Sequence, residues 1–179
     1  MKKKYENLSS RSARGFTLVE LIVTVAIVAI IATVATPALS TLMRNNRLST
    51  ENFQFIKALK YARSQAITLK QNIVVASISG TQNWATGWTI TDAAGNVLQQ
   101  SNGFGNGSVF TQDQLQPSIV FTRFGFVNNP AAAPFTFTHN DANATCIGNY
   151  SGQITINANG QITSIPIVCD GNNEFTLDS

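Results

Sequence analysis

The longest apolar stretch of the chain lies near its N-terminus. Residues 21–43 contain no charged side chain, and residues 21–35 are almost wholly apolar. With residues 16–20 in front, the stretch reaches the roughly 20 residues that a helix needs to span a bilayer. It is too long and too apolar for an ordinary helix of a soluble domain. We therefore expect residues 16–43 to form a membrane-spanning helix.

A secretory signal peptide and a plain signal anchor are the two alternatives for this stretch. A signal peptide has an apolar core of about 7–15 residues, followed by a small-residue cleavage site. Here the core is longer, and residues 35–38 make a poor cleavage site. Neither alternative explains Glu20, an ionisable residue just inside the apolar stretch. Since a carboxylate at mid-helix costs about 2.5–3.5 kcal/mol on insertion scales, even one nearer the helix end needs a reason.

A second helical pattern covers residues 44–70. Six basic residues, from Arg44 to Lys70, occupy much of it, and we expect them on a solvated or contact face. Pro37 lies before this pattern, and because a proline removes a backbone hydrogen bond we expect a helix kink there. The apolar residues recur at spacings of three, four and seven, as one face of a helix requires: Leu48, Phe55, Leu59, Ala62, Ala66 and Leu69.

After Lys70 the pattern changes to short β-branched and aromatic runs bounded by turn residues. Asn159 and Gly160 are a strong hairpin signal, and Pro166 should force an edge position or a bulge. The pattern predicts an α+β fold, in which a long N-terminal helix packs its distal half on an antiparallel sheet. Strands are predicted at 73–78, 84–90, 119–124, 135–138, 153–157 and 161–168, and loops at 101–108, 128–134 and 140–149.

Charge is unevenly distributed along the chain. Residues 1–15 carry five basic side chains and one acidic one. The positive-inside rule keeps such a segment in the cytoplasm, so everything after Met43 lies across the membrane, in the periplasm of a cell with two membranes. From Gln71 onward Arg123 is the only basic residue, against six acidic ones. Because a nucleic-acid surface needs cations opposite the phosphates, we expect no nucleic acid to bind there.

Two cysteines, Cys146 and Cys169, lie in the C-terminal part of the chain. Two are too few for a disulfide-rich scaffold. One bridge between them is expected if this part lies in an oxidising compartment. The alternative is a pair of free buried thiols, because free cysteine is among the most buried residue types.

The sequence shows no catalytic or metal-binding constellation. The single histidine, His139, lies in a polar stretch and is expected in an exposed loop rather than at a metal. The glycine-rich residues 103–107 precede no helical pattern, which argues against a phosphate site. The common zinc, calcium, P-loop and serine-nucleophile motifs do not occur. We therefore expect no metal, no cofactor and no enzyme activity, and an enzyme on a signal anchor is the remote alternative.

The residues at the start of the apolar stretch resemble the processing site of type IV prepilins and type II secretion pseudopilins. The matching octapeptide, R-G-F-T-L-V-E-L, begins at Arg14, with a basic leader before it and the apolar run after it. The resemblance implies that a prepilin peptidase removes residues 1–15 by cutting between Gly15 and Phe16, and that Phe16 is then N-methylated. It also implies that Glu20 acts in assembly by pairing with the Phe16 amine of a neighbouring subunit. Such a pair would explain a carboxylate in an apolar bundle.

The resemblance continues through most of the chain, with less specific motifs. Residues 55–67, F-I-K-A-L-K-Y-A-R-S-Q-A-I, are similar to the helix of the FimT/FimU/GspH group of minor pilins and pseudopilins. W-A-T-G-W at 84–88 resembles their W-x-x-G-W strand, and its two tryptophans are expected in the core rather than at a ligand. The resemblance implies a type IV pilin-like fold with three segments: a leader at 1–15, a transmembrane and assembly helix at 16–43, and a periplasmic head at 44–179. The head consists of an amphipathic helix at 44–70 and a β-rich part at 71–179.

The implied function is that of a minor pilin, a structural subunit that helps to initiate type IV pilus assembly and sits at or near the tip. Its partners would be the prepilin peptidase, other minor and major pilins or pseudopilins, and the inner-membrane assembly platform. It would cross the bacterial inner membrane once, with its head in the periplasm, before joining the pilus at the cell surface. The closest alternative, a minor pseudopilin of a type II secretion system, shares leader, helix and head; the A-R-S-Q-A-I helix and the pair Thr36 and Pro37 favour the pilus.

A pilus-associated DNA receptor for natural transformation is the alternative from another class. Some FimT-like proteins implicated in DNA uptake carry G-R-x-R near the C-terminus. Here the nearest stretch, G-Q-I-T beginning at Gly160, lacks both arginines. This departure and the acidic balance of the distal part argue against carrying the DNA-binding function over.

Overall fold

The computed structural model divides into two compact units, Met1–Leu39 and Ser40–Ser179, and we call the second unit the head. The residues that the structure describes are 15–81, 83–104, 107–114, 116–128, 133–141, 151–169 and 175–177.

A single helix, α1 Leu18–Leu69, covers 52 residues and includes both helical patterns of the sequence. It begins after Thr17, whose hydroxyl accepts a hydrogen bond from the backbone N–H of Glu20 at 3.2 Å. Such a cap satisfies one of the N–H groups that the first helical turn leaves unpaired. The helix continues through Pro37, and the kink predicted there stays a prediction.

α1 is long and apolar enough to cross a membrane. Threonines interrupt its apolar sequence, yet each of three hydroxyls donates to a backbone carbonyl about one turn earlier. In a bilayer every polar group needs a partner within the protein. These bonds therefore let the threonines lie in lipid without an unpaired hydroxyl: Thr24 to Leu21 at 2.8 Å, Thr33 to Ile30 at 2.7 Å and Thr36 to Ala32 at 2.7 Å.

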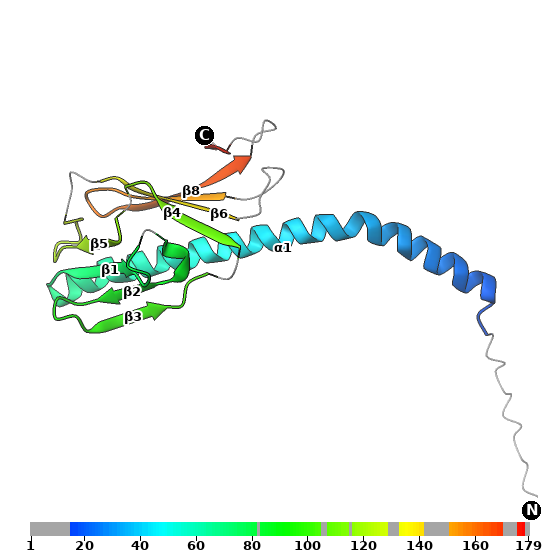
Figure 1. The fold of residues 1–179 in the computed structure, drawn as a ribbon, viewed down its shortest axis with the longest axis horizontal. Helices are drawn as coiled ribbons and strands as arrows, with labels where there is room; N and C mark the ends of the chain where they lie inside the picture. The colour runs from blue at the N-terminus through cyan, green and yellow to red at the C-terminus, as the bar shows by residue number, and fades with distance from the viewer. Residues whose placement is uncertain are drawn as a thin grey trace, which may run out of the picture. The chain divides into compact units, whose positions relative to one another are not determined.

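The head contains two antiparallel sheets (Figure 1). The first sheet has four strands in the order β3-β2-β1-β5, with one irregularity between Ile90 and Thr91. A one-turn 3-10 helix, η1 Trp84–Thr86, precedes β2. The strands of this sheet are β1 Ile73–Ser77, β2 Trp88–Thr91, β3 Val97–Ser101 and β5 Ser118–Phe121.

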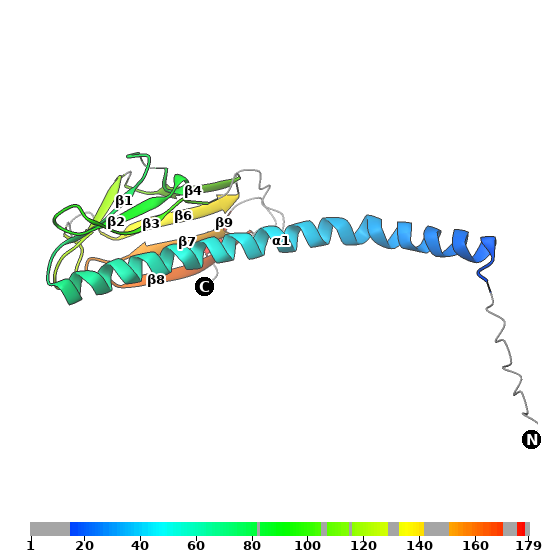
Figure 2. The same ribbon diagram turned by 90° about the horizontal axis from the view of Figure 1, so that it is seen from below.

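The second sheet has five strands in the order β4-β6-β7-β8-β9. The predicted hairpin joins β7 to β8, and its turn is closed by a hydrogen bond of 2.8 Å from the Gly160 N–H to the Asn157 carbonyl. Within the head, α1 runs beside β7 and β8 (Figure 2). The strands are β4 Ser108–Gln112, β6 Phe135–Asp141, β7 Ser151–Ile156, β8 Ile162–Cys169 and β9 Phe175–Leu177.

Phe55 of α1 joins the two sheets into one core. It has no exposed surface. Its ring meets Trp88 of β2, Phe110 of β4 and Phe137 of β6 edge-on, with centroid distances of 5.0, 4.7 and 5.0 Å. Edge-to-face pairs contribute about 0.5–1.5 kcal/mol each beyond the area that they bury. Trp84 is fully buried as well, so both tryptophans are core residues as predicted.

The run at 84–90 is not the continuous strand that the sequence predicts. Trp84 lies in η1, which the Asn83 side chain caps by accepting from the Ala85 N–H at 3.1 Å. The chain then turns at Gly87, whose φ of 116° suits glycine. A Cβ on Gly87 would overlap the carbonyl oxygen of Ser101. The motif therefore marks a close crossing of two backbone segments, which is why the strand begins only after the glycine.

Three strands, β3, β4 and β9, are absent from the sequence-based prediction. β3 forms an edge of its sheet, and Val97 on it is 58% exposed, so no buried alternation marks it. The predicted loop at 101–108 is shorter than expected because its end residues belong to β3 and β4. Of the loop predicted at 140–149, the first two residues belong to β6, and residues 142–149 lie outside the described residues.

Pro166 lies on an inner strand, without the bulge that the sequence allowed for. It pairs with Gly152 in a regular register between β7 and β8. The described pairing of β8 with β9 begins only at Ile167. At the proline the described neighbour of β8 is β7, and the edge position stays a prediction.

Candidate functional site

The residues that the sequence marks for processing and assembly lie together at the start of α1. Gly15 and Phe16 precede the helix, and Phe16 is 78% exposed. Glu20 lies in the first turn and is exposed too. The structure therefore leaves the bond between Gly15 and Phe16, and the Glu20 carboxylate, accessible to other molecules.

The charge pattern of this segment favours a cationic partner for Glu20. Glu20 is the only charged residue among residues 15–39. The N-terminus of a helix carries about half a positive elementary charge, which favours a carboxylate in the first turn. In an apolar bundle a carboxylate also needs an ionic partner, and a cut before Phe16 would create an amine that can serve. The roles of Gly15, Phe16 and Glu20 stay predictions.

The predicted disulfide falls largely outside the described residues. Cys146 is not among them, and Cys169 is the last residue of β8, with its side chain undescribed. The bridge between the two cysteines therefore stays a prediction.

His139 is not the exposed loop residue that the sequence predicts. It lies on β6 and has no exposed surface. Its Nδ1 atom lies 2.9 Å from Asn52 Oδ1, and its Nε2 atom lies 3.0 Å from Glu51 Oε2. The ring stacks on Phe104 at a centroid distance of 5.0 Å and meets Phe110 edge-on at 5.2 Å. Both ring nitrogens are thus directed at polar side chains of α1.

The pleat of β6 explains why His139 points inward. Alternate residues of a strand face the same side, and Phe135, Phe137 and His139 are all buried. The residue opposite His139 on β7 is Gly152. A Cβ at this position would overlap the side-chain amide of Asn52, so the glycine leaves the room that Asn52 occupies.

Glu51 links the helix to a further strand. Its Oε2 atom accepts a hydrogen bond from the Ser108 hydroxyl, at the start of β4, at 2.6 Å. Its Oε1 atom lies 3.7 Å from Arg47 Nε, and the residue is only 7% exposed. A buried carboxylate is tolerated when it is paired and hydrogen-bonded. We call Glu51, Asn52, Ser108 and His139 the polar cluster, and it fixes α1 to β4 and β6.

Sequence reasoning missed the polar cluster, although one signal for it was present. The period-two alternation of Phe135, Phe137 and His139 marks the histidine as an inward residue of a strand. Glu51 and Asn52 lie three and four residues after Leu48, so the helical spacing places both positions on the apolar face, and only their polar side chains argue against burial. Their burial depends on strands that are distant in sequence.

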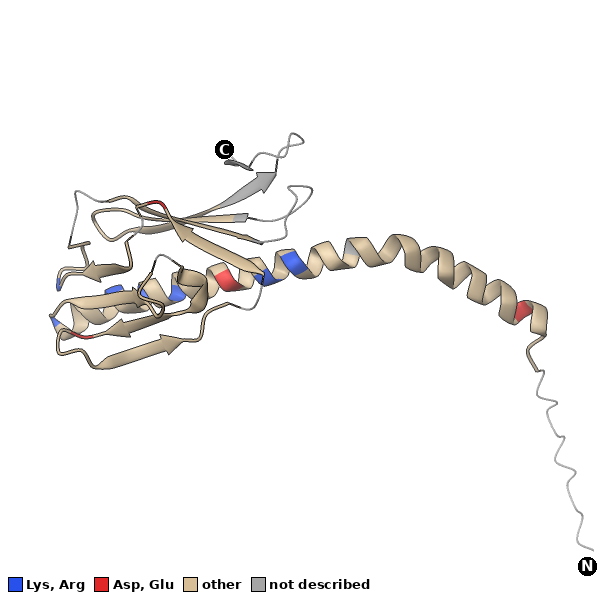
Figure 3. Ribbon diagram, in the orientation of Figure 1, with Lys and Arg blue, Asp and Glu red and all other residues tan. Residues whose placement is uncertain are grey.

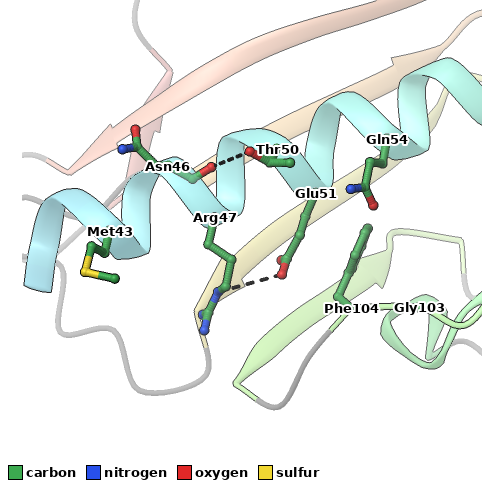
Figure 4. A pocket seen from close by; sticks show the side chains of 8 residues that line it. All are labelled: Met43, Asn46, Arg47, Thr50, Glu51, Gln54, Gly103 and Phe104. Carbon is green, nitrogen blue, oxygen red and sulfur yellow. Dashed lines mark hydrogen bonds and ion pairs between the residues drawn. The ribbon is translucent and has the colours of Figure 1, made fainter.

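A cavity of about 460 Å³ lies beside the polar cluster (Figure 4). The side chain of Arg47 points toward Glu51, and Phe104 lies across from them on the segment after β3. Among the described residues, no group of three or more histidine, cysteine or acidic side chains is placed to hold a metal ion. The cavity combines charged, polar, aromatic and thioether contacts. Its lining is Met43, Asn46, Arg47, Thr50, Glu51, Gln54, Gly103 and Phe104.

The sequence predicts a solvated or contact face for the basic residues of α1, and Arg63 in addition forms hydrogen bonds to two turns of the head. Its Nε atom donates to the Gly125 carbonyl at 3.0 Å, and its Nη2 atom donates to the Asn159 carbonyl at 3.2 Å. One side chain thus fastens two turns of the head to the helix, the turn after β5 and the hairpin between β7 and β8.

The sequence matches the model of the GspH family, described as type II transport protein GspH, over residues 54–160. The chain belongs to the GspH family. A second match, to the prokaryotic N-terminal methylation motif, covers residues 10–36 and therefore includes Gly15, Phe16 and Glu20. A comparison with curated protein sequences found no match.

Solved structures agree with this assignment of the fold. Two crystal forms of the type IV minor pilin FimU of Pseudomonas aeruginosa match with TM-scores of 0.58 and 0.56 and identities of 20% and 19%. They cover 73% and 72% of the GspH-family chain and 93% and 96% of FimU. The minor pseudopilin EpsH of the Vibrio cholerae type 2 secretion system has a TM-score of 0.49 at 15% identity, over 66% of this chain and 96% of EpsH. The FimU match confirms the predicted type IV pilin-like fold.

Family, motif and fold together identify the class of the protein. This GspH-family chain is a minor pilin or a minor pseudopilin, as the resemblance of its motifs implies. The family is one of structural pilin subunits.

Proposed function

We propose that this GspH-family protein is a minor pilin that helps to initiate type IV pilus assembly and lies at or near the pilus tip. Before assembly it crosses the inner membrane once, with its head in the periplasm. The observation that carries the proposal is the start of α1. There Glu20 is the sole charged residue in the membrane-spanning part, and it closely follows the exposed bond between Gly15 and Phe16.

Removal of the leader changes the electrostatics of this segment. The leader holds five basic residues and one acidic one, which keep the N-terminus on the cytoplasmic side. A prepilin peptidase that cuts after Gly15 removes these charges and leaves one amine, on Phe16. When two subunits pack their helices in lipid, an unpaired Glu20 is costly, and the neighbour's amine neutralises it. Because the two groups meet at one axial offset only, the pair sets the register of the subunits.

A minor pseudopilin of a type II secretion system is the second candidate, and the family match itself favours it. The fold match to a type IV minor pilin and the pair Thr36 and Pro37 favour the pilus. Deletion of the gene in the producing bacterium separates the two. If the protein is a minor pilin, the deletion sharply lowers the number of surface pili counted by electron microscopy, while secretion of type II substrates continues. Complementation with the gene should then restore the number of pili. The opposite result, normal pili and blocked secretion, establishes the pseudopilin.

The role of Glu20 is tested in the complemented strain. We expect Glu20→Ala to leave membrane insertion and leader cleavage intact and to reduce incorporation into sheared filaments. Thr24→Val is the matched control, because the Thr24 hydroxyl bonds only within its own helix, to the Leu21 carbonyl at 2.8 Å. Normal incorporation of Glu20→Ala contradicts the proposed pairing.

A further inference from the structure

The cavity beside the polar cluster lies next to the apolar part of α1. Met43, which ends the charge-free residues 21–43, is the first residue of its lining along the chain. Arg47 and Thr50 follow on the same side of the helix, at spacings of four and three residues. Figure 3 shows the matching change along α1, from a long part without charge to a part with charges of both signs. The cavity thus begins where the expected membrane-spanning residues end.

The length of the apolar part relates this cavity to the lipid headgroups. A helix rises about 1.5 Å per residue, so residues 16–43 extend about 42 Å along their axis. A bilayer measures roughly 40–45 Å when its headgroup regions are included. With Phe16 at one surface of the membrane, we therefore expect Met43 at the headgroups of the opposite leaflet, which is the leaflet next to the head.

Two side chains of opposite charge line the cavity. The Arg47 Nε atom lies 3.7 Å from the Glu51 Oε1 atom, and the Arg47 side chain is 39% exposed. The Ser108 hydroxyl and the His139 ring lie at the other carboxylate oxygen, Oε2. A cation that enters the cavity would therefore meet Oε1. Phe104 lies across from both charged side chains (Figure 4).

This combination suits a ligand that carries both a phosphate and an ammonium group. The guanidinium of Arg47 matches the geometry of phosphate oxygens. The carboxylate of Glu51 attracts an ammonium group, and the aromatic ring of Phe104 attracts a cation as well. A purely anionic headgroup would be attracted by the arginine but repelled by the glutamate. The volume of about 460 Å³ lies within the range of roughly 300–1,000 Å³ that is usual for small-ligand sites.

We propose that this cavity binds the headgroup of a phosphatidylethanolamine molecule in the leaflet next to the head. The phosphate lies against Arg47, the ammonium group lies between Glu51 and Phe104, and Met43 contacts the beginning of the acyl chains. The bound lipid holds the subunit at a fixed depth in the membrane before assembly. The proposal rests on the single membrane crossing and not on a role in the pilus, so it applies equally to a minor pseudopilin.

Native mass spectrometry of the full-length protein in detergent tests the headgroup directly, because it counts the lipids bound at each added lipid concentration. We expect phosphatidylethanolamine to half-load the protein at a lower concentration than phosphatidylcholine or phosphatidylglycerol. The trimethylammonium group of phosphatidylcholine has no N–H to donate to Glu51, and phosphatidylglycerol has no ammonium group. Equal or tighter binding of phosphatidylglycerol, or a protein dimer that takes up no lipid, overturns the proposal.

Charge variants supply the second measurement. Arg47→Gln should raise the phosphatidylethanolamine concentration for half-loading about tenfold, equivalent to about 1.4 kcal/mol, and Arg47→Lys should raise it less. Lys57→Gln is the matched control, because it removes the same charge from an exposed position of α1 outside the cavity. An equal loss in Arg47→Gln and Lys57→Gln overturns the proposal. Tryptophan fluorescence checks that each variant is folded, and the headgroup preference of the unaltered protein carries the test if Arg47→Gln is not.

Soluble phosphoethanolamine separates a lipid from a free headgroup. It should displace the lipid only in large excess, because it lacks the contact with Met43. Displacement at equal concentration would overturn the assignment to a lipid. The pilus function is tested separately, by deletion of the gene. Normal pili after deletion, with the lipid preference intact, would remove the pilus function and leave the lipid site, whereas lost pili without the lipid preference would remove only the lipid site.

Discussion

The Nε2 atom of His139 on β6 lies 3.0 Å from the Oε2 atom of Glu51 on α1. The pair joins α1 to the inner face of the second sheet. Since His139 has no exposed surface and Glu51 is only 7% exposed, the contact is shielded from water. Shielding makes such a contact specific, because the polar atoms have no alternative partner in solvent.

The polar cluster should contribute measurably to the stability of the head. We expect His139→Ala to lower the free energy of unfolding by about 1–3 kcal/mol, because it leaves buried polar atoms of Glu51 and Asn52 without this partner. Urea unfolding of residues 40–179, followed by tryptophan fluorescence, measures the change. Gln99→Ala, on the exposed edge strand β3, is the control and should stay within about 0.5 kcal/mol of the parent. An equally small effect of His139→Ala would show that the cluster is not a stabilising contact.

Gly152 and Asn52 should be energetically coupled. Gly152→Ala places a Cβ where the Asn52 amide now lies, so we expect a loss of about 1–3 kcal/mol from overpacking. Asn52→Ala makes room for that methyl group. In the same unfolding assay the double variant should therefore lose less than the two single variants together. Strict additivity would contradict the close approach of the two residues.

The predicted bridge between Cys146 and Cys169 can be tested by thiol labelling. It would close a loop of about 23 residues and stabilise the head by roughly 3 kcal/mol in the chain-entropy model. We expect no labelled cysteine in the unreduced, denatured protein isolated from the periplasmic side, and two after reduction. Two labelled thiols before reduction would establish the alternative, a pair of free cysteines.

The head should not act as a DNA receptor. Each phosphate contact adds about −0.9 to the slope of log affinity against log salt, and from Gln71 onward Arg123 is the only basic residue. We expect no specific or salt-steep DNA binding by residues 44–179 in a fluorescence titration at about 150 mM salt. Residual binding should weaken when Lys57, Lys60 and Arg63 are replaced. Micromolar binding that survives these replacements would restore the DNA-receptor alternative.

The sequence predicts the parts of the fold that have a strong local period. The apolar run and the spacing from Leu48 to Leu69 predict α1, and Asn159 with Gly160 predicts the last hairpin. β3 escapes prediction because it is an exposed edge strand, where neither face is buried enough to impose alternation. The polar neighbours of His139 predict a loop, whereas its burial follows from the pleat that it shares with Phe135 and Phe137.

The candidate sites, like the elements of the fold, divide into those that a local sequence pattern predicts and those that it does not. The processing and assembly residues form a short linear motif, so their positions follow from the sequence alone. The polar cluster is assembled from residues far apart in the chain, such as Asn52 and His139. Such sites depend on strand order and register, which local patterns do not encode.

The central claim is that residues 1–15 are a prepilin leader and that the mature subunit begins at Phe16. N-terminal sequencing and intact mass of the protein extracted from membranes of the producing bacterium test it most directly. We predict a chain that begins at Phe16 with an N-methyl group, and loss of this processing in a strain without the prepilin peptidase. A mature chain that begins after Ala35 or Ala38 would identify an ordinary signal peptide and contradict the account, as would a chain that keeps residues 1–15.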